Sequence, residues 1–354
     1  MLTDDFDYEL PEERIAQRPA PRGESRLLVL DAESADRHRR VRDLPELLRP
    51  GDLLVVNDTR VIPARLFARR RPGGGRVELL LVEKVGPREW DVLVRPGRKA
   101  RPGTALDLAP GLEADMVERP EEREPGPAGG DGRRRVRFAE PVEPWLDRLG
   151  HVPLPPYIRR GDEAADRTTY QTVYARNPGA IAAPTAGLHL SEELLAALAA
   201  RGIETAAVTL HVGIGTFQPV TAALVHEHRM ERERYEIPEE TAAQIATTRA
   251  AGGRIVAVGT TVVRTLEGAP REDSARPVPA GAGSTDLFIV PGFRFRVVDV
   301  LLTNFHLPRS TLLMLVSAFA GRERVLAAYR EAIREGYRFY SYGDAMLVER
   351  REAG

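Results

Sequence analysis

The stretch that organises this chain begins as Ala182-Ala-Pro-Thr-Ala-Gly-Leu-His189 and continues in Val208-Thr-Leu-His-Val-Gly-Ile-Gly-Thr-Phe217. Between the two segments, Ser191 and the two glutamates after it are typical of a helix N-terminus, where exposed N–H groups favour oxygen acceptors and negative charge. Ser310 likewise predicts the cap of a helix at 312–320. The apolar run 203–210 then predicts a buried strand that ends at His211. Because ligands in α/β folds bind beyond the carboxyl ends of strands, this unit predicts a site at that edge.

Two glycines after this strand allow another interpretation. Gly213-Ile-Gly215 begins like a dinucleotide-binding loop, but the third glycine is missing and Pro219 stands where the helix would start. We therefore reject a dinucleotide site. A histidine at a strand end is also often a hydrogen-bonded structural residue, and a glycine there is often only part of a turn.

Composition limits the class of protein. With 354 residues the chain can hold two domains, each with its own core. The formal charge is −1, so a nucleic-acid partner must be held by a local basic patch. The absence of cysteine excludes disulfides, thiolate catalysis and Cys-ligated zinc. No apolar run is long enough to span a membrane and no signal region is visible, so we expect a cytoplasmic protein without membrane association.

The pattern of secondary-structure signals changes between residues 64 and 150. Short strand-like runs separated by Gly and Pro replace the alternation of strands and helices seen elsewhere. We predict an inserted all-β barrel domain at 64–150, with 1–63 and 151–354 forming the two parts of a wound, barrel-like α/β core. Within the insert, the acidic, Pro- and Gly-rich run 120–132 predicts a mobile hairpin tip. Basic clusters in the insert are often only solvated surface, but their recurrence favours RNA contact. The expected RNA-binding residues are Arg69, Arg70, Arg71, Arg98 and Lys99.

Polar residues follow several of the predicted strands. Histidine has a reference pKa of about 6.5 and can exchange a proton near neutrality, and an aspartate can orient it or hold a cation. Each of these residues could instead cap a loop, and it is their joint placement that favours a site. The candidate catalytic residues are His189, His211, His306 and Asp344.

Two other chemistries are disfavoured. No Gly-x-Ser-x-Gly sequence is present, which argues against a serine hydrolase. His226 and His228 with Glu231 and Glu233 could bind a metal, but no clear ligand spacing supports it, and we predict no metal site.

Eight segments, in order and spread over nearly the whole chain, resemble one known family. They are Asn57-Asp-Thr-Arg-Val-Ile-Pro-Ala-Arg-Leu66, His151-Val-Pro-Leu-Pro-Pro-Tyr-Ile158, Tyr170-Gln-Thr-Val-Tyr-Ala175, Ala183-Pro-Thr-Ala-Gly-Leu-His189, Val208–Phe217, Val258-Gly-Thr-Thr-Val-Val-Arg-Thr-Leu-Glu267, Thr303-Asn-Phe-His-Leu-Pro-Arg-Ser-Thr-Leu-Leu-Met-Leu315 and Ser341-Tyr-Gly-Asp-Ala-Met346. Together they resemble the S-adenosylmethionine:tRNA ribosyltransferase-isomerases of queuosine synthesis. Two positions depart from the family pattern: Leu190 replaces an aromatic residue, and Glu231 stands where a second histidine is expected.

The resemblance implies a reaction and its partners. The ribosyl part of S-adenosylmethionine would be joined to 7-aminomethyl-7-deazaguanine at the wobble position of a tRNA with a GUN anticodon. Epoxyqueuosine would form while adenine and methionine leave. The resemblance implies no cofactor beyond S-adenosylmethionine as co-substrate, and a monomer or homodimer. Because the sulfonium acidifies its neighbouring carbon, the reaction needs a base for that proton and an acid for adenine.

The same resemblance suggests which residues contact the substrate. Asp58 and Asp344 could balance the sulfonium, and Tyr342 or Phe217 could face it. The hydroxyls of Thr260 and Thr261 suit an anion at a helix N-terminus, although they are equally ordinary caps. The expected substrate-binding residues are Asp58, Arg60, Thr185, Gly213, Gly215, Phe217, Thr260, Thr261, Arg264, Asn304 and Tyr342.

Two rival functions make different predictions. A non-catalytic RNA-binding or chaperone-like protein would have no affinity for S-adenosylmethionine. An S-adenosylmethionine-dependent RNA methyltransferase would leave S-adenosylhomocysteine, and its glycine-rich strand-to-helix loop is poorly formed here.

Overall fold

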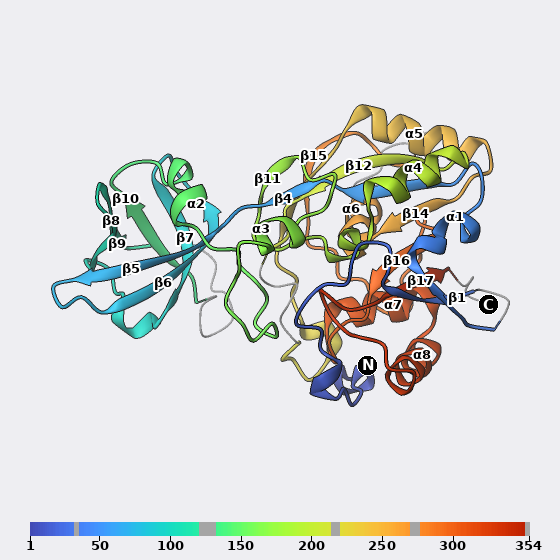
Figure 1. Ribbon diagram of the computed structural model, residues 1–354, viewed down its shortest axis with the longest axis horizontal. Coiled ribbons are helices and arrows are strands. Elements are labelled where there is room, and N and C mark those ends of the chain that lie inside the picture. The colour runs from blue at the N-terminus through green and yellow to red at the C-terminus, as the bar shows by residue number, and fades with distance from the viewer. Residues whose placement is uncertain (32–34, 120–131, 214–219, 270–276, 351–354) are drawn as a thin grey trace. The chain divides into compact units, whose positions relative to one another are not determined.

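The computed structural model describes residues 1–31, 35–119, 132–213, 220–269 and 277–350 (Figure 1). The chain divides into two compact units. Unit 1 comprises Met1–Arg60, Pro155–Gly161 and Thr168–Gly354, and unit 2 comprises Val61–Leu154 and Asp162–Arg167. The mobile hairpin tip expected near residues 120–132 lies almost entirely outside the described residues. The domain boundaries expected after residues 63 and 150 stay a prediction.

Unit 1 is built on a nine-stranded mixed sheet with the order β15-β13-β12-β3-β14-β16-β17-β1-β2. Its strands are β1 (Arg26–Leu30), β2 (Arg37–Arg40), β3 (Leu53–Asn57), β12 (Glu204–Leu210), β13 (Glu233–Ile237), β14 (Ile255–Val258), β15 (Gly281–Thr285), β16 (Val300–Asn304) and β17 (Ala345–Glu349). Four adjacent strands, β12, β3, β14 and β16, run parallel to one another. Their carboxyl ends therefore meet at one edge of the sheet.

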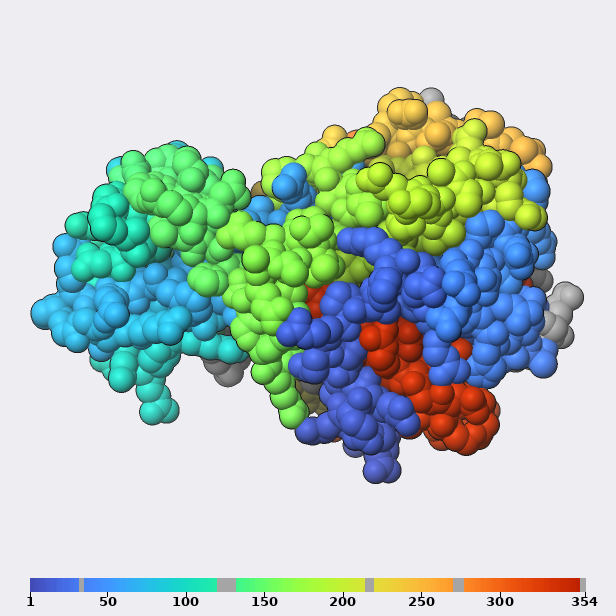
Figure 2. Space-filling view, viewed as in Figure 1, coloured from blue at the N-terminus to red at the C-terminus, as the bar shows by residue number. Residues whose placement is uncertain are grey.

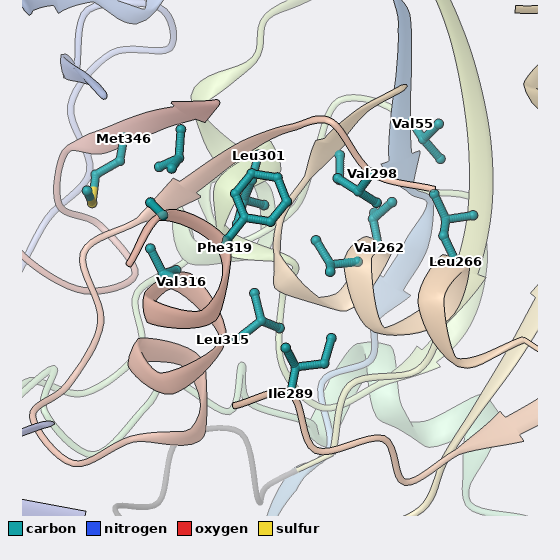
Figure 3. Close-up of a cluster of buried hydrophobic side chains, with 14 of the residues drawn as sticks. Val55, Val262, Leu266, Ile289, Val298, Leu301, Leu315, Val316, Phe319 and Met346 are labelled. Carbon is teal, nitrogen blue, oxygen red and sulfur yellow. The ribbon is translucent and has the colours of Figure 1, made fainter. Parts of the chain in front are cut away.

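The central strands are buried on both faces, which explains their continuous apolar sequence. In β3, Leu53 and Val55 pack into one core cluster while Leu54 and Val56 pack into the other. Side chains of α1 (Leu44–Leu47) and α4 (Glu192–Ala200) belong to the second cluster. The first cluster contains side chains of α5 (Glu239–Ala250), α6 (Thr260–Gly268), α7 (Thr311–Ala320) and α8 (Arg322–Arg334). Figure 3 shows part of it, with Val262, Leu301 and Phe319 among the packed side chains.

The helix starts expected from capping residues are confirmed. The hydroxyl of Ser191 accepts a hydrogen bond from the backbone N–H of Leu194 at 3.1 Å, and α4 begins directly after it. Ser310 caps α7 in the same way through the N–H of Leu313. Among the described residues, no helix is both long and apolar enough to cross a membrane.

Unit 2 contains a closed barrel of six antiparallel strands, in the order β10-β7-β6-β5-β8-β9. The strands are β5 (Arg65–Arg71), β6 (Arg76–Lys84), β7 (Glu89–Arg95), β8 (Ala105–Ala109), β9 (Leu112–Val117) and β10 (Arg134–Phe138), followed by α2 (Glu143–Leu149). Alternate residues such as Leu66, Ala68, Val77 and Leu79 are buried inside the barrel, as closure requires.

The expected fold class, an α/β core with an inserted β barrel, is confirmed. One detail differs. Among the described residues the core sheet is open, with β15 and β2 at its two edges, so the closed barrel belongs to the insert and the core is not barrel-like. Three short elements remain: the helix α3 (Asp166–Thr169), and the strands β4 (Thr59–Val61) and β11 (Asn177–Ala180), which form a separate two-stranded sheet.

Candidate active site at the carboxyl edge of the sheet

The carboxyl ends of the four parallel strands bring most of the expected site residues to one edge. Asn57 ends β3 and Asp58 follows it, His211 follows β12, Gly259-Thr260-Thr261 follows β14, and Asn304 ends β16. Since neighbouring strands lie about 4.8 Å apart, the ends of β3 and β16 are separated by roughly 10 Å. Small-molecule substrates of α/β enzymes bind at edges of this kind.

Asn57 holds two of these strand ends together. Its amide oxygen accepts from the N–H groups of Leu210 (3.0 Å) and Thr59 (3.2 Å). Its amide nitrogen donates to the carbonyl of Leu210 at 3.0 Å and to the hydroxyl of Thr261 at 3.3 Å. The side chain is fully buried and extends the β3–β12 ladder by one step beyond its last backbone pair. This fixes the chain immediately before His211.

His211 stands beside a buried carboxylate. Its Nδ1 lies 2.8 Å from the hydroxyl of Thr59, and no partner of its Nε2 is recorded within the described ranges. Asp58 is 7% exposed, and one carboxylate oxygen accepts from the hydroxyl of Thr209 at 2.6 Å. The amide of Asn177 donates to the same carboxylate at 3.1 Å.

The environment of His211 keeps its imidazole neutral yet accessible. Burial lowers its pKa, while the negative charge of Asp58 opposes that shift and the charge of Arg234 adds to it. The ring packs against the backbone of Gly179: a Cβ there would come within 2.8 Å of the imidazole. Glycine is therefore required at 179 for the ring to occupy this position, a feature that the sequence did not reveal.

His189 sits in a closed hydrogen-bond network. The amide nitrogen of Asn304 donates to His189 Nε2 at 3.1 Å and to the carbonyl of Tyr340 at 3.1 Å. His189 Nδ1 lies 3.0 Å from the hydroxyl of Ser25, to which it donates in this tautomer. Burial and the nearby arginines lower the pKa of His189 to about 4. Both ring nitrogens are thus engaged, and the neutral ring orients Asn304.

Thr185 and His306 complete this part of the edge. Thr185 begins the short helix η5 (Thr185–His189) and donates its hydroxyl to the Asn304 carbonyl oxygen at 3.2 Å. His306 Nε2 lies 2.8 Å from the hydroxyl of Thr303, and burial lowers the pKa of His306 to about 3. A pocket within unit 1 is lined in part by Tyr157, Thr185, Asn304, His306, Tyr340 and Ser341.

Arg264 and Glu233 form a buried ion pair at the other side of the edge. Arg264 also donates through Nε to the carbonyl of Leu287 at 3.1 Å, and the other Glu233 oxygen accepts the N–H of Gly213 at 3.1 Å. Within the part of the chain that the structure describes, the Nη2 of Arg264 is buried without a hydrogen-bond partner. The sequence pointed to Arg264 and Gly213 but gave no indication that Glu233 joins them.

The remaining expected residues are placed differently. Both carboxylate oxygens of Asp344 accept backbone N–H groups, from Arg26 at 2.9 Å and Arg338 at 2.8 Å, so this carboxylate ties loops to the sheet. Tyr342 is buried with its ring edge-on to Tyr170 at 5.9 Å. Arg60 is exposed in β4. Thr260 is buried at the start of α6. Gly215 and Phe217 lie outside the described residues.

The expected RNA-binding residues all belong to unit 2. Arg69, Arg70 and Arg71 lie in β5, and Arg98 and Lys99 are exposed in the short helix η4 (Gly97–Lys99). Among the described residues, no group of three or more His, Asp or Glu side chains is placed to hold a metal; Glu233 pairs with Arg264, and His228 packs edge-on against Phe288 at 5.2 Å.

A histidine and a buried carboxylate at the carboxyl edge of an open α/β sheet define an enzyme of the α/β class, and the chain carries a separate β barrel in addition. A family model described as "Queuosine biosynthesis protein" matches residues 3–348, and the chain belongs to this family. The resemblance to S-adenosylmethionine:tRNA ribosyltransferase-isomerases is thereby confirmed.

Several relatives carry that name. The protein from Gloeobacter violaceus is 58% identical over 98% of this chain and 96% of its own length, and the one from Trichlorobacter lovleyi is 52% identical over 98% and 100%. Among solved structures, a crystal structure of S-adenosylmethionine tRNA ribosyltransferase from Thermotoga maritima superposes with a TM-score of 0.54. It is 43% identical and covers 97% of this chain and 99% of its own.

Proposed function

We propose that this chain transfers and isomerises the ribosyl group of S-adenosylmethionine onto 7-aminomethyl-7-deazaguanine at the wobble position of a GUN-anticodon tRNA. Epoxyqueuosine is the product, and adenine and methionine are released. Family membership supports the reaction, and the names of the relatives give S-adenosylmethionine and tRNA as its substrates. The observation that carries the residue assignment is the half-buried imidazole of His211 beside Asp58.

His211 is the general base in this proposal. A base must be neutral when substrate arrives and must present a free nitrogen within hydrogen-bond reach. The lowered pKa of His211 meets the first condition, and its Nε2 meets the second. The proton taken from the carbon next to the sulfonium can pass from this imidazolium to the departing adenine, which accounts for both proton transfers with one residue.

Asp58 supplies the negative charge that the sulfonium requires. It is fixed by the hydroxyl of Thr209 and the amide of Asn177, so it need not reorganise as charge develops. Asp344 is left out of the chemistry because both of its oxygens are already bound to backbone N–H groups.

His189 and His306 act in this proposal as neutral residues that shape the pocket. His189 orients Asn304, whose carbonyl oxygen keeps a lone pair for substrate beyond the bond from Thr185. Arg264 offers its unpartnered Nη2 to an acceptor on the methionine part of S-adenosylmethionine. The protein acts in the cytoplasm, where its tRNA is found, as a monomer or homodimer and with no cofactor beyond its co-substrate.

Adenine release tests the reaction. The protein is incubated with S-adenosylmethionine and tRNA that carries either 7-aminomethyl-7-deazaguanine or plain guanine at the wobble position. Adenine should appear only with the first tRNA, because the second lacks the nucleophilic amine. Adenine formed equally with both, or S-adenosylhomocysteine in its place, would contradict the proposal.

A further inference from the structure

Two arginines face each other on the outer surface of the barrel. Arg69 of β5 and Arg76 of β6 are directly opposed in the antiparallel register, and both are exposed. Directly opposed like charges destabilise a sheet. Among the described residues neither forms an ion pair with a carboxylate: Arg69 makes one long hydrogen bond to the carbonyl of Gly74, and Arg76 lies over an aromatic ring. An anion between them would relieve this repulsion.

The acidic residues nearby are already paired with other arginines. Asp107 is opposite Arg69 in the β5–β8 register, yet its carboxylate lies 3.0 Å from Nε of Arg71. Glu113 pairs with the same Arg71 at 2.8 Å. On β6, Glu78 pairs with Arg65 at 3.3 Å. The positive charges of Arg69 and Arg76 therefore remain available to a partner, whereas that of Arg71 is neutralised.

A groove of about 520 Å³ opens beside this pair, a size typical of small-ligand sites. Its walls combine cations with apolar groups: Phe67, Arg69, Arg76, Leu108, Ala109 and Pro110. The carboxylates of Asp107 and Glu113, which pair with Arg71, also line it. All of them belong to unit 2, and β5 and β6 contribute to the exposed surface of that unit (Figure 2).

One wall of the groove is formed by an arginine that lies over a phenylalanine ring. The guanidinium of Arg76 lies 4.0 Å from the ring centroid of Phe67, and the other contact of Phe67 is edge-on, with His151 at 4.9 Å. A guanidinium held over an aromatic ring can serve as a surface on which an unpaired base stacks. The half-buried Leu108 and Ala109 add an apolar floor.

We propose that this groove binds one unstacked nucleotide of the tRNA substrate. Its phosphate lies between Arg69 and Arg76, and its base lies against the Arg76–Phe67 stack and the apolar floor. The identity of the partner as tRNA rests on the proposed function. Within the basic cluster of β5, the proposal assigns RNA contact to Arg69, because the guanidinium of Arg71 is already paired with Asp107 and Glu113.

Binding of fluorescent tRNA to Arg69→Gln, Arg76→Gln and Phe67→Leu tests the groove. Loss of one charge-assisted contact should weaken binding about tenfold for either arginine variant. Removing both arginines should flatten the log–log salt dependence by about 0.7, the value for one single-stranded phosphate. Arg88→Gln is the matched control. It removes an exposed arginine from the hairpin at the opposite end of β6 and should bind like wild type.

Thermal unfolding separates a binding role from a structural one. Arg69→Gln removes the cross-strand repulsion, so its melting temperature should equal or exceed that of wild type while its tRNA affinity falls. Wild-type affinity and salt slope in both arginine variants would overturn the proposal, as would an equal loss in Arg88→Gln. If the wild-type protein releases adenine but these variants bind tRNA normally, the groove does not bind the nucleotide, while the proposed reaction is supported. If the wild-type protein releases no adenine but the variants bind tRNA weakly, the nucleotide-binding groove is supported and the proposed reaction is contradicted.

Discussion

Replacing Asn57 by alanine should loosen the edge of the sheet that carries His211. The substitution leaves three buried backbone groups without partners: the N–H and C=O of Leu210 and the N–H of Thr59. Each unsatisfied buried group costs about 1 kcal/mol or more. Asn57→Ala should therefore lower the free energy of unfolding by about 3 kcal/mol, which is large against the usual effect of about 1 kcal/mol for a point substitution.

Urea unfolding monitored by two signals measures this loss where it occurs. Ellipticity at 222 nm reports mainly unit 1, which contains α4 to α8, whereas both tryptophans, Trp90 and Trp145, belong to unit 2. With an m value of ~3 kcal/mol/M, the ellipticity midpoint should fall by roughly 1 M. The tryptophan transition should stay near its wild-type position.

The matched control is Asn177→Ala, which makes the same chemical change at an exposed position. The Asn177 amide donates to Asp58 and Thr209 side chains, and water can replace it, so its midpoint should change little. Equal midpoints for Asn57→Ala and Asn177→Ala would refute the view that Asn57 closes the β3–β12 edge. So would a shift confined to tryptophan emission.

Three further outcomes are expected. His211→Gln should lower turnover about 10²- to 10⁴-fold. Wild-type turnover should fall as the pH drops through the lowered pKa of His211. A rate–pH profile that is the same in the variant would exclude His211 as the base. Gly179→Ala should reduce turnover up to about 10²-fold by displacing the His211 ring while far-UV ellipticity stays native, and wild-type kinetics would contradict that packing. Burial lowers the pKa of His189 to about 4 and that of His306 to about 3, so the stability they contribute is complete above pH 6.5 and is lost as pH falls toward those values. In the His306→Gln variant the free energy of unfolding should depend less steeply on pH. Between pH 4 and 6 its slope should be smaller than that of wild type by about 1.4 kcal/mol per pH unit. Equal slopes for variant and wild type would count against the burial of His306 as a neutral ring.

Sequence patterns predicted the elements whose signals are local. Ser191 and Ser310 marked the starts of α4 and α7 because a cap involves neighbouring residues only. The buried strands β3 and β12 were visible as apolar runs. By contrast, β5 reads as a basic cluster, since its outward side chains are Phe67 and arginines, and its strand character comes from pairing with β6 and β8.

The candidate site was predicted as a set of residues and not as an arrangement. Strand ends placed His211 and Asn304 at one edge, because parallel strands share that edge. No sequence pattern indicated that Ser25 would lie 3.0 Å from His189, 164 residues away, or that Gly179 would support His211. Such contacts depend on strand order and on close packing, which a linear pattern does not encode.

The mass of the modified nucleoside tests the central claim most directly. Wild-type protein is incubated with S-adenosylmethionine labelled with ¹³C throughout its ribose and with tRNA bearing 7-aminomethyl-7-deazaguanine, and the tRNA is then digested for mass spectrometry. The wobble nucleoside should gain the mass of an epoxycyclopentane unit with all five ribose carbons labelled, together with equal amounts of free adenine and methionine. A nucleoside that gains only an unlabelled methyl group, or an unchanged nucleoside with adenine retained in its co-substrate, would contradict the account.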